Sequence, residues 1–158
     1  MSLSQSFTRW LLSFRSNNFK TEAILRKHVQ DIGTQNVPNI PASLRSMCDV
    51  EEFLLQDQKV VQLTPKGKAS QDHILYIHGG GYIHELAYAH WLIITQLVKH
   101  TNAAVTVPLY ALAPEHDHTK ATPMMDALYD RIAAGRERKK TFVAGDSAGG
   151  NFALGLAL

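Results

Sequence analysis

The sequence predicts an α/β fold in which a mostly parallel sheet carries helices on both faces. Short apolar runs alternate with longer stretches of helical periodicity from residue 74 to the end of the 158-residue chain. The apolar runs are too short for helices and have no polar side, which is typical of strands buried on both faces of a parallel sheet. Parallel strands need crossover connections, and these are right-handed in almost every known case. The alternation therefore leaves little freedom in the topology.

The first 45 residues are expected to form two helices and a linker. A first helix is indicated by apolar residues at helical spacing, namely Leu3, Phe7, Trp10, Leu11 and Phe14. A second helix is expected from Phe19 to about Ile32, ended by Gly33, with a linker from Asn36 to Pro41. Residues 1–20 hold three basic residues and no acid, a composition shared by transit peptides and by ordinary amphipathic helices. We take the second interpretation, in which the two helices of residues 1–45 are either the start of a cap or simply packing elements.

Residues 46–158 are expected to carry the strands and helices of the α/β sheet. Strand-like sequence runs from about Val50 to Leu63, and Pro65 and Gly67 mark a turn over residues 64–68. The later strands are expected at residues 74–77, 103–107 and 141–144. Helices are expected at residues 87–100, from Thr122-Pro123 to Gly135, and from Ala148 onward. Their inward stripes are predicted to be Leu86, His90, Ile93 and Leu97 in the first and Met124, Leu128 and Ile132 in the second.

Composition limits the partners and the compartment. Hydrophobic residues make up 45% of the chain and charged residues 19%, which is typical of a globular protein. With 16 basic and 14 acidic residues the net charge is +2, so no nucleic-acid partner is expected, and the basic run at residues 136–140 is interpreted as a solvated loop. No apolar run approaches the roughly 18 residues of a membrane span. Cys48 has no second cysteine to pair with, which suits a cytoplasmic location.

The sequence from Gly145 to Gly149 fits the pattern G-x-S-x-G. It follows an expected buried strand and opens a helix, which is the context of a nucleophile elbow. Ser147 would sit in a strained turn that lifts its hydroxyl above the sheet at a helix N-terminus, where backbone N–H groups favour negative charge. The competing interpretation is a glycine-rich turn of a nucleotide-binding fold, but no G-x-G-x-x-G pattern is present.

His78-Gly79-Gly80-Gly81 directly follows another expected strand. Glycines at a strand end let backbone N–H groups point into a cleft without side chains in the way, as an oxyanion hole requires. A flexible glycine loop is the alternative. Because ligands in open α/β sheets bind at the carboxyl ends of the strands, two such features at those ends favour a common site.

Three motifs resemble the hormone-sensitive-lipase-like family of α/β-hydrolase carboxylesterases. They are His78 to Tyr82, Tyr110 to Glu115, and Gly145 to Asn151, in that family's order and at similar spacing. The resemblance implies that residues 46–158 are the first part of an α/β-hydrolase catalytic domain. It also implies hydrolysis of a small-molecule ester through an acyl-enzyme on Ser147. It implies an oxyanion hole made by the N–H groups of Gly80, Gly81 and Ala148.

The same resemblance implies supporting roles for other motif residues. His78, with Gly79, would fix the glycine loop through hydrogen bonds rather than act as the base. Tyr110 would brace the strand ends, and the side chain of Asp146 would point away from the serine hydroxyl. No cofactor and no metal are expected.

The acid and base of a triad have no candidates in the chain. In this fold both follow the serine in sequence, and only eleven residues follow Ser147, so we expect them beyond Leu158. His84, His90, His100, His116 and His118 all precede it. His116-Asp117-His118 could hold a metal from a strand, but a solvated loop is the interpretation we adopt because no third ligand is evident.

Three functional hypotheses follow. The first is a carboxylesterase or lipase-like hydrolase whose full chain supplies the missing residues. The second is a non-catalytic protein that binds a small molecule in the same cleft, and the third is an inactive truncated product. Residues 1–158 alone would expose a strand edge, so we expect them to be poorly soluble or to associate, and a homo-oligomer is left open.

Overall fold

The computed structural model describes residues 21–32, 35–135 and 140–158, and the chain divides into two compact units, residues 1–34 and 35–158. In the first unit, α2 (Glu22–Ile32) is an amphipathic helix with exposed ion pairs one turn apart, Glu22 with Arg26 and Lys27 with Asp31. The second helix expected from the sequence is thus present over its described part. The first expected helix, at residues 3–14, lies outside the described residues. The cap assignment for residues 1–45 stays a prediction.

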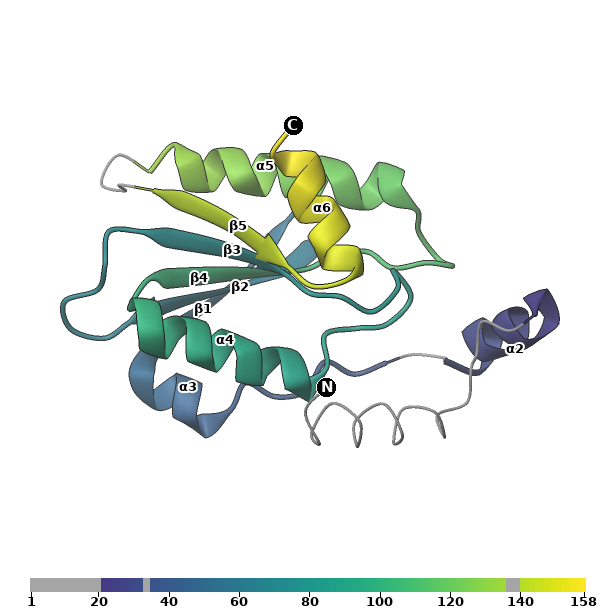
Figure 1. Cartoon of the computed structure of the whole chain (residues 1–158), viewed down its shortest axis with the longest axis horizontal. Helices are drawn as coiled ribbons and strands as arrows, with labels where there is room; N and C mark the ends of the chain where they lie inside the picture. Colours follow the sequence, from purple (N-terminus) through teal and green to yellow (C-terminus); the bar gives the residue numbers. More distant parts are fainter. Residues whose placement is uncertain (1–20, 33–34, 136–139) are drawn as a thin grey trace, which may run out of the picture. The chain divides into compact units, whose positions relative to one another are not determined.

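The second unit is built on a mixed sheet with helices on both faces, as Figure 1 shows. Over the described residues its strand order is β1-β2-β4-β3-β5, with β1 (Cys48–Leu55), β2 (Gln58–Pro65), β3 (His73–Ile77), β4 (Ala104–Leu109) and β5 (Thr141–Gly145). β3 runs parallel to both β4 and β5, and β2 runs antiparallel to β1 and β4. The parallel strands β3, β4 and β5 are the ones that the alternation of strands and helices in the sequence predicts.

The first two strands correct the expectation of one strand-like stretch from Val50 to Leu63. They form a hairpin whose two-residue turn is Gln56-Asp57, with φ of 49° and 62°. Such turns normally use Asn and Gly, since few other residues tolerate positive φ. Without that signal, the break between the strands could not be found in the sequence.

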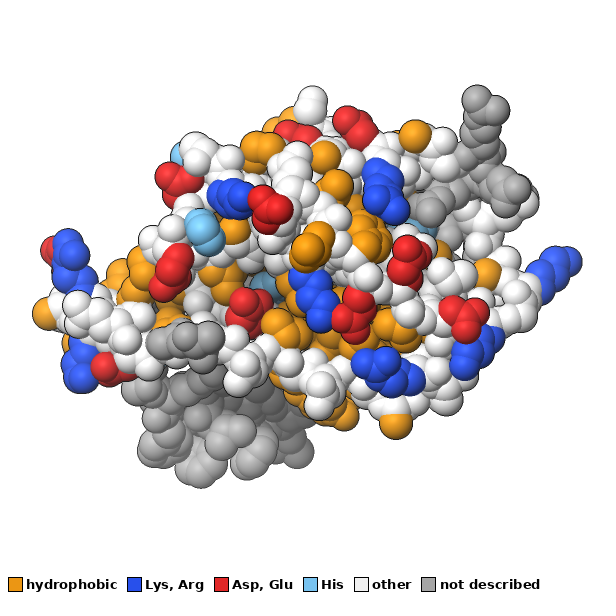
Figure 2. Space-filling view, turned by 180° about the vertical axis from the view of Figure 1, so that it is seen from behind, with side chains coloured by type: hydrophobic (Ala, Val, Ile, Leu, Met, Phe, Trp, Pro, Cys, Tyr) orange, Lys and Arg blue, Asp and Glu red, His pale blue; other side chains and the backbone are white. Residues whose placement is uncertain are grey.

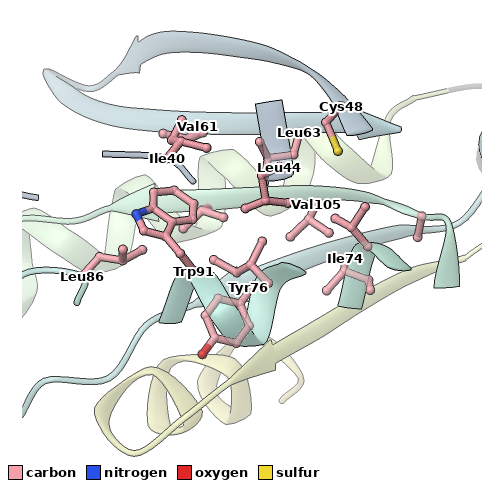
Figure 3. Close-up of a cluster of buried hydrophobic side chains, with 14 residues drawn as sticks. Ile40, Leu44, Cys48, Val61, Leu63, Ile74, Tyr76, Leu86, Trp91 and Val105 are labelled. Atoms are coloured by element: carbon pink, nitrogen blue, oxygen red, sulfur yellow. The ribbon is translucent and has the colours of Figure 1, made fainter. Parts of the chain in front are cut away.

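Helices α3 (Ala42–Met47) and α4 (Tyr88–Thr101) cover one face of the sheet, and α5 (His118–Ala133) and α6 (Ala148–Leu156) cover the other (Figure 1). Each face has its own apolar cluster. Figure 3 shows the first cluster, where Trp91 of α4 and Leu44 of α3 lie against strand residues such as Val61 and Ile74. The two clusters bury the strands from both sides, so the sheet has the two-faced burial expected from its continuous apolar runs.

Two helix predictions need correction. In α4 the buried residues are Trp91, Ile94, Thr95 and Val98, whereas Ile93 of the predicted stripe is 43% exposed. The helix is rotated so that the indole, its largest apolar group, is covered and its Nε1–H donates to the carbonyl of Pro38 at 2.9 Å. Burying the indole stabilises this orientation of the helix more than burying the predicted stripe, which includes His90, would.

The second correction concerns the start of α5. It begins at His118, with Asp117 as N-cap accepting from the N–H of Thr119 at 2.9 Å, and Pro123 lies inside the helix. Asp is a stronger cap than Thr, so the helix begins before the predicted Thr122-Pro123 start. Its predicted inner residues Met124, Leu128 and Ile132 are all buried.

Charged side chains of both signs are interspersed on the face shown in Figure 2. Among the described helices, none is long and apolar enough to cross a membrane. No group of three or more His, Cys, Asp or Glu residues suited to a metal ion occurs within the part of the chain that the structure describes. His116 and His118 are exposed around the start of α5.

Candidate active site

The register between β3 and β5 brings the two glycine-rich motifs together. Ile77, the last residue of β3, pairs with Gly145, the last residue of β5, and the strands are parallel. The residues that follow each strand therefore leave the sheet side by side. β4 flanks β3 on its other side and leads into Tyr110. The three motifs found in the sequence thus meet at the carboxyl ends of β3, β4 and β5.

Ser147 has the backbone strain of a nucleophile elbow. Its φ is 48° and its ψ is −117°, and it is the exposed N-cap residue of α6. The neighbouring glycines permit this turn, because a Cβ on Gly145 would overlap the carbonyl of Gly149, and one on Gly149 would overlap the carbonyl of Ile77. The strained conformation persists because strand and helix are packed around it.

The glycine loop presents backbone donors. Gly80 and Gly81 have φ of 135° and 63°, and the carbonyl of Gly80 accepts the N–H groups of Ile83 and His84 at 3.2 and 3.0 Å. Within the described residues, no hydrogen bond uses the N–H of Gly80 or Gly81. Ala148 is the first residue of α6, where a helix leaves its N–H without an intrahelical partner. These donors can serve an anion.

The carboxylate of Asp146 connects the elbow to the glycine loop. Its Oδ1 accepts the N–H of Gly79 at 2.9 Å and the hydroxyl of Tyr76 at 2.8 Å, and its Oδ2 lies 3.5 Å from Nε2 of His90. Partial burial acts to raise the pKa of Asp146, but the hydrogen bonds and the nearby His90 outweigh it, so the pKa lies below its ordinary value. The group is therefore an ionised acceptor at neutral pH. A Cβ on Gly79 would overlap this carboxylate.

His78 is buried beneath the glycine loop. Its Nδ1 donates to the carbonyl of Gly79 at 2.7 Å, and its ring stacks on that of Tyr110 with centroids 4.5 Å apart. The hydroxyl of Tyr110 donates to the carbonyl of His78 at 2.8 Å. Burial lowers the pKa of His78 to about 4, so the ring is neutral at pH 7. The side chain is engaged with the loop and shares no hydrogen bond with Ser147, and the role predicted for it stays a prediction.

Sequence reasoning missed three residues around this loop. Gln35 holds it from outside, with its amide nitrogen donating to the carbonyl of Ile83 at 2.9 Å and its oxygen accepting the N–H of Glu85 at 3.2 Å. No sequence signal marks a contact this distant along the chain. Tyr76 and His90 are the other two.

Tyr76 did carry a signal, because a tyrosine within a buried aliphatic strand needs a partner for its hydroxyl. Figure 3 shows that hydroxyl turned away from the aliphatic cluster. The N–H of Ala87 donates to Nδ1 of His90 at 2.8 Å, so Nε2 is the ring nitrogen that faces Asp146, 3.5 Å from its Oδ2. Tyr76 and His90 therefore both lie against Asp146, the residue that binds the N–H of Gly79 in the glycine loop.

Ser147 has no base beside it within residues 21–32, 35–135 and 140–158. Among the described residues, none forms a side-chain hydrogen bond with the Ser147 hydroxyl. His90 approaches Asp146, and His116 and His118 lie around the start of α5. The expectation that the acid and the base lie beyond Leu158 stays a prediction.

A family model for the α/β-hydrolase fold matches residues 74–158, more than half of the chain. The chain belongs to the α/β-hydrolase fold family. The fold class expected from the sequence is confirmed, and the match places the chain in the α/β-hydrolase family to which the three motifs pointed.

Three comparisons illustrate the relationship of this α/β hydrolase to known proteins. It is 30% identical over 154 residues to an esterase of Acinetobacter venetianus, covering 87% of this chain and 49% of that protein. It superposes on an esterase/lipase from an uncultured bacterium with a TM-score of 0.70 at 22% identity, covering 99% of this chain and 52% of the other. For an esterase of the bacterial hormone-sensitive lipase family the TM-score is 0.59 at 18% identity, covering 90% and 45%. The chain thus spans about half the length of each of these three proteins.

Proposed function

We propose that the protein is a serine carboxylesterase, lipase-like in its fold, that hydrolyses small-molecule carboxylic esters through an acyl-enzyme on Ser147. The observation that carries the proposal is the pairing of Ile77 with Gly145, which sets the donor-bearing glycine loop beside the strained serine. The relatives named esterase support the same reaction class.

In the proposed reaction, Oγ of Ser147 attacks the ester carbonyl carbon, and the N–H groups of Gly80, Gly81 and Ala148 stabilise the oxyanion. Collapse of the intermediate breaks the ester C–O bond, and the alcohol leaves with the proton that Ser147 gave up. Water then cleaves the acyl-enzyme to release the carboxylic acid. No cofactor or metal enters these steps.

The proton must pass through a base, because an unassisted serine is a weak nucleophile. We propose that the acid and the histidine of the triad come from sequence beyond Leu158, in the order serine, acid, histidine of this fold. The supporting observation is that the Ser147 hydroxyl has no hydrogen-bond partner among the described residues.

The proposal is tested by labelling the full-length protein with a serine-directed phosphonate. We expect one label on Ser147, and a loss of ester hydrolysis of roughly 10³-fold or more in Ser147→Ala. Ser43→Ala, an exposed serine of α3, is the matched control and should change neither result. A folded protein that takes up no label would overturn the assignment, and ligand binding without turnover would favour the non-catalytic alternative.

The remaining expectations concern location and partners. We propose a cytoplasmic location, which suits an unpaired, buried Cys48. Cell fractionation of a tagged protein tests this. The proposed partner is the ester itself.

A further inference from the structure

The proposed oxyanion hole depends on the position of one carboxylate. Asp146 accepts the N–H of Gly79 at 2.9 Å, and a Cβ on Gly79 would overlap its Oδ2. Gly80 and Gly81, whose N–H groups are the proposed donors, follow directly in the chain. The torsion that orients the carboxylate of an aspartate is broad and roughly two-fold. The orientation of Asp146 is therefore decided by what its two oxygens contact.

Tyr76 contacts the first of these oxygens from within the sheet. Its hydroxyl donates to Oδ1 of Asp146 at 2.8 Å, while its ring is buried in the apolar cluster of Figure 3. In the register of β3 and β5 it pairs with Ala144, two residues before Asp146, and it precedes Gly79 by three residues. A close-packed ring has little freedom to move. The hydroxyl is therefore a fixed donor between the elbow and the glycine loop.

His90 of α4 faces the second oxygen. Its Nε2 lies 3.5 Å from Oδ2 of Asp146, and its Nδ1 accepts the N–H of Ala87, the N-cap residue of the helix, at 2.8 Å. The ring also lies beside that of His78, with centroids 5.6 Å apart and planes tilted by 49°. The contact with Ala87 thus fixes which ring nitrogen faces the carboxylate, and the helix holds the ring in place.

We propose that Tyr76 and His90 are positioning residues for ester hydrolysis, which set the geometry of the oxyanion hole by fixing both oxygens of Asp146. The inference rests on the proposed function and adds two residues that act only through this carboxylate. The Asp146 side chain is 41% exposed, so water competes for any oxygen that the protein releases. A turned carboxylate would move Gly79 and the donors that follow it, and a misplacement of about 1 Å can cost roughly 100-fold in rate.

Two substitutions at His90 separate its two contacts. Asparagine can place its amide oxygen near the position of Nδ1 and keep the bond from Ala87, whereas glutamine can place an N–H donor near Nε2 and keep the contact with Asp146. We expect His90→Asn to lower kcat of the full-length protein roughly 3- to 10-fold, with KM within about twofold, because one hydrogen bond contributes at that level. His90→Gln should keep kcat within about twofold of the wild type. His100→Asn, at an exposed position near the end of α4, is the matched control and should change neither constant.

Tyr76→Phe removes one hydroxyl and keeps the buried ring. We expect it to lower kcat of the full-length protein on p-nitrophenyl acetate roughly tenfold, with little change in KM. In an Asp146→Ala background, Tyr76→Phe and His90→Asn should each change kcat by less than about twofold, because the contact through which they act is already gone. Tyr129→Phe, at a partly buried position of α5, is the matched control for the loss of a tyrosine hydroxyl.

Three results would overturn the inference while leaving esterase activity established. They are no loss of kcat in Tyr76→Phe or in His90→Asn, equal losses in His90→Asn and His90→Gln, and losses that persist in the Asp146→Ala background. The last would show that the two residues stabilise the fold without acting through Asp146. This distinction holds for a variant with a lowered melting temperature, because a general loss of folded protein would persist in both backgrounds. If no ester is hydrolysed and Ser147 takes no phosphonate label, the proposed function itself fails and the positioning role fails with it.

Discussion

Asp146 shows how one carboxylate can couple two loops that are far apart in the sequence. It precedes Ser147 in the chain, yet its hydrogen bonds go to Gly79 and Tyr76. The sequence predicts that this side chain points away from the serine hydroxyl, and its hydrogen bonds go instead to the glycine loop and to β3. We therefore regard Asp146 as a positioning residue for the proposed oxyanion hole.

Asp146→Ala should lower kcat of the full-length protein roughly 10- to 100-fold with little change in KM, because a hydrogen bond to a charged group contributes at about that level. Asp146→Asn keeps an acceptor oxygen and should recover part of the loss. Steady-state kinetics with a short ester provide the measurement. A change confined to KM, or none, would show that the glycine loop holds its geometry without this carboxylate.

His78 is a buried, neutral ring with a pKa of about 4 in the fold, against about 6.5 in an unfolded chain. Between these values the unfolded state binds a proton that the folded state does not. We therefore expect stability to be complete above about pH 6.5, to fall as the pH drops toward 4, and to lose nothing further from this group below that. The loss should be about 3 kcal/mol.

Thermal unfolding of the full-length protein from pH 7.5 to 4 measures this loss. His78→Gln should flatten the profile over the window from pH 6.5 to 4. His100→Gln, at an exposed position near the end of α4, should leave it unchanged. Identical profiles for the wild type and His78→Gln would contradict the buried neutral state.

At the scale of elements, α6 can follow directly on Ser147, its N-cap, only because its first turn packs on the end of β3. The carbonyl of Ile77 occupies the place where a Cβ of Gly149 would stand. Gly155, near the other end of the same helix, faces open space. The two glycines share an element but differ in what surrounds them.

Gly149→Ala should therefore destabilise the full-length protein by several kcal/mol, since backbone atoms must move to admit the methyl group. Gly155→Ala should stabilise it by up to about 1 kcal/mol through helix propensity. Chemical denaturation compares the two. Equal effects would show that the contact between α6 and β3 relaxes easily.

At the scale of the whole molecule, the two edges of the sheet differ. β1 carries Asp49, Glu51 and Glu52, and charges on an edge strand oppose pairing with another chain. β5 has no charged residue, pairs only with β3 among the described residues, and exposes 48% of Phe142. Leu154 of α6 is exposed as well.

Residues 1–158 produced alone should therefore associate at micromolar concentration, with a mass above 17.6 kDa by size-exclusion chromatography with light scattering. Phe142→Lys should shift the population toward monomer. Leu54→Lys makes the same change on β1 and should not. A single monomeric species of the unsubstituted chain that melts cooperatively would contradict this prediction.

The sequence by itself determined the parallel half of the fold and the positions of its two glycine motifs. These are local properties, because a short apolar run, a glycine cluster and a following amphipathic stretch lie within about fifteen residues of one another. The nucleophile candidate Ser147 and the donors at Gly80 and Gly81 could be named for the same reason. The hairpin at Gln56-Asp57 could not, because its turn residues carry no characteristic signal.

Only the tertiary structure decided which residues support the site. Gln35, Tyr76 and His90 reach the glycine loop and Asp146 through contacts that span many positions in the chain. The rotation of α4 likewise depends on how separate elements pack. Such contacts depend on strand register and side-chain volume, and neither is written in any one stretch of sequence.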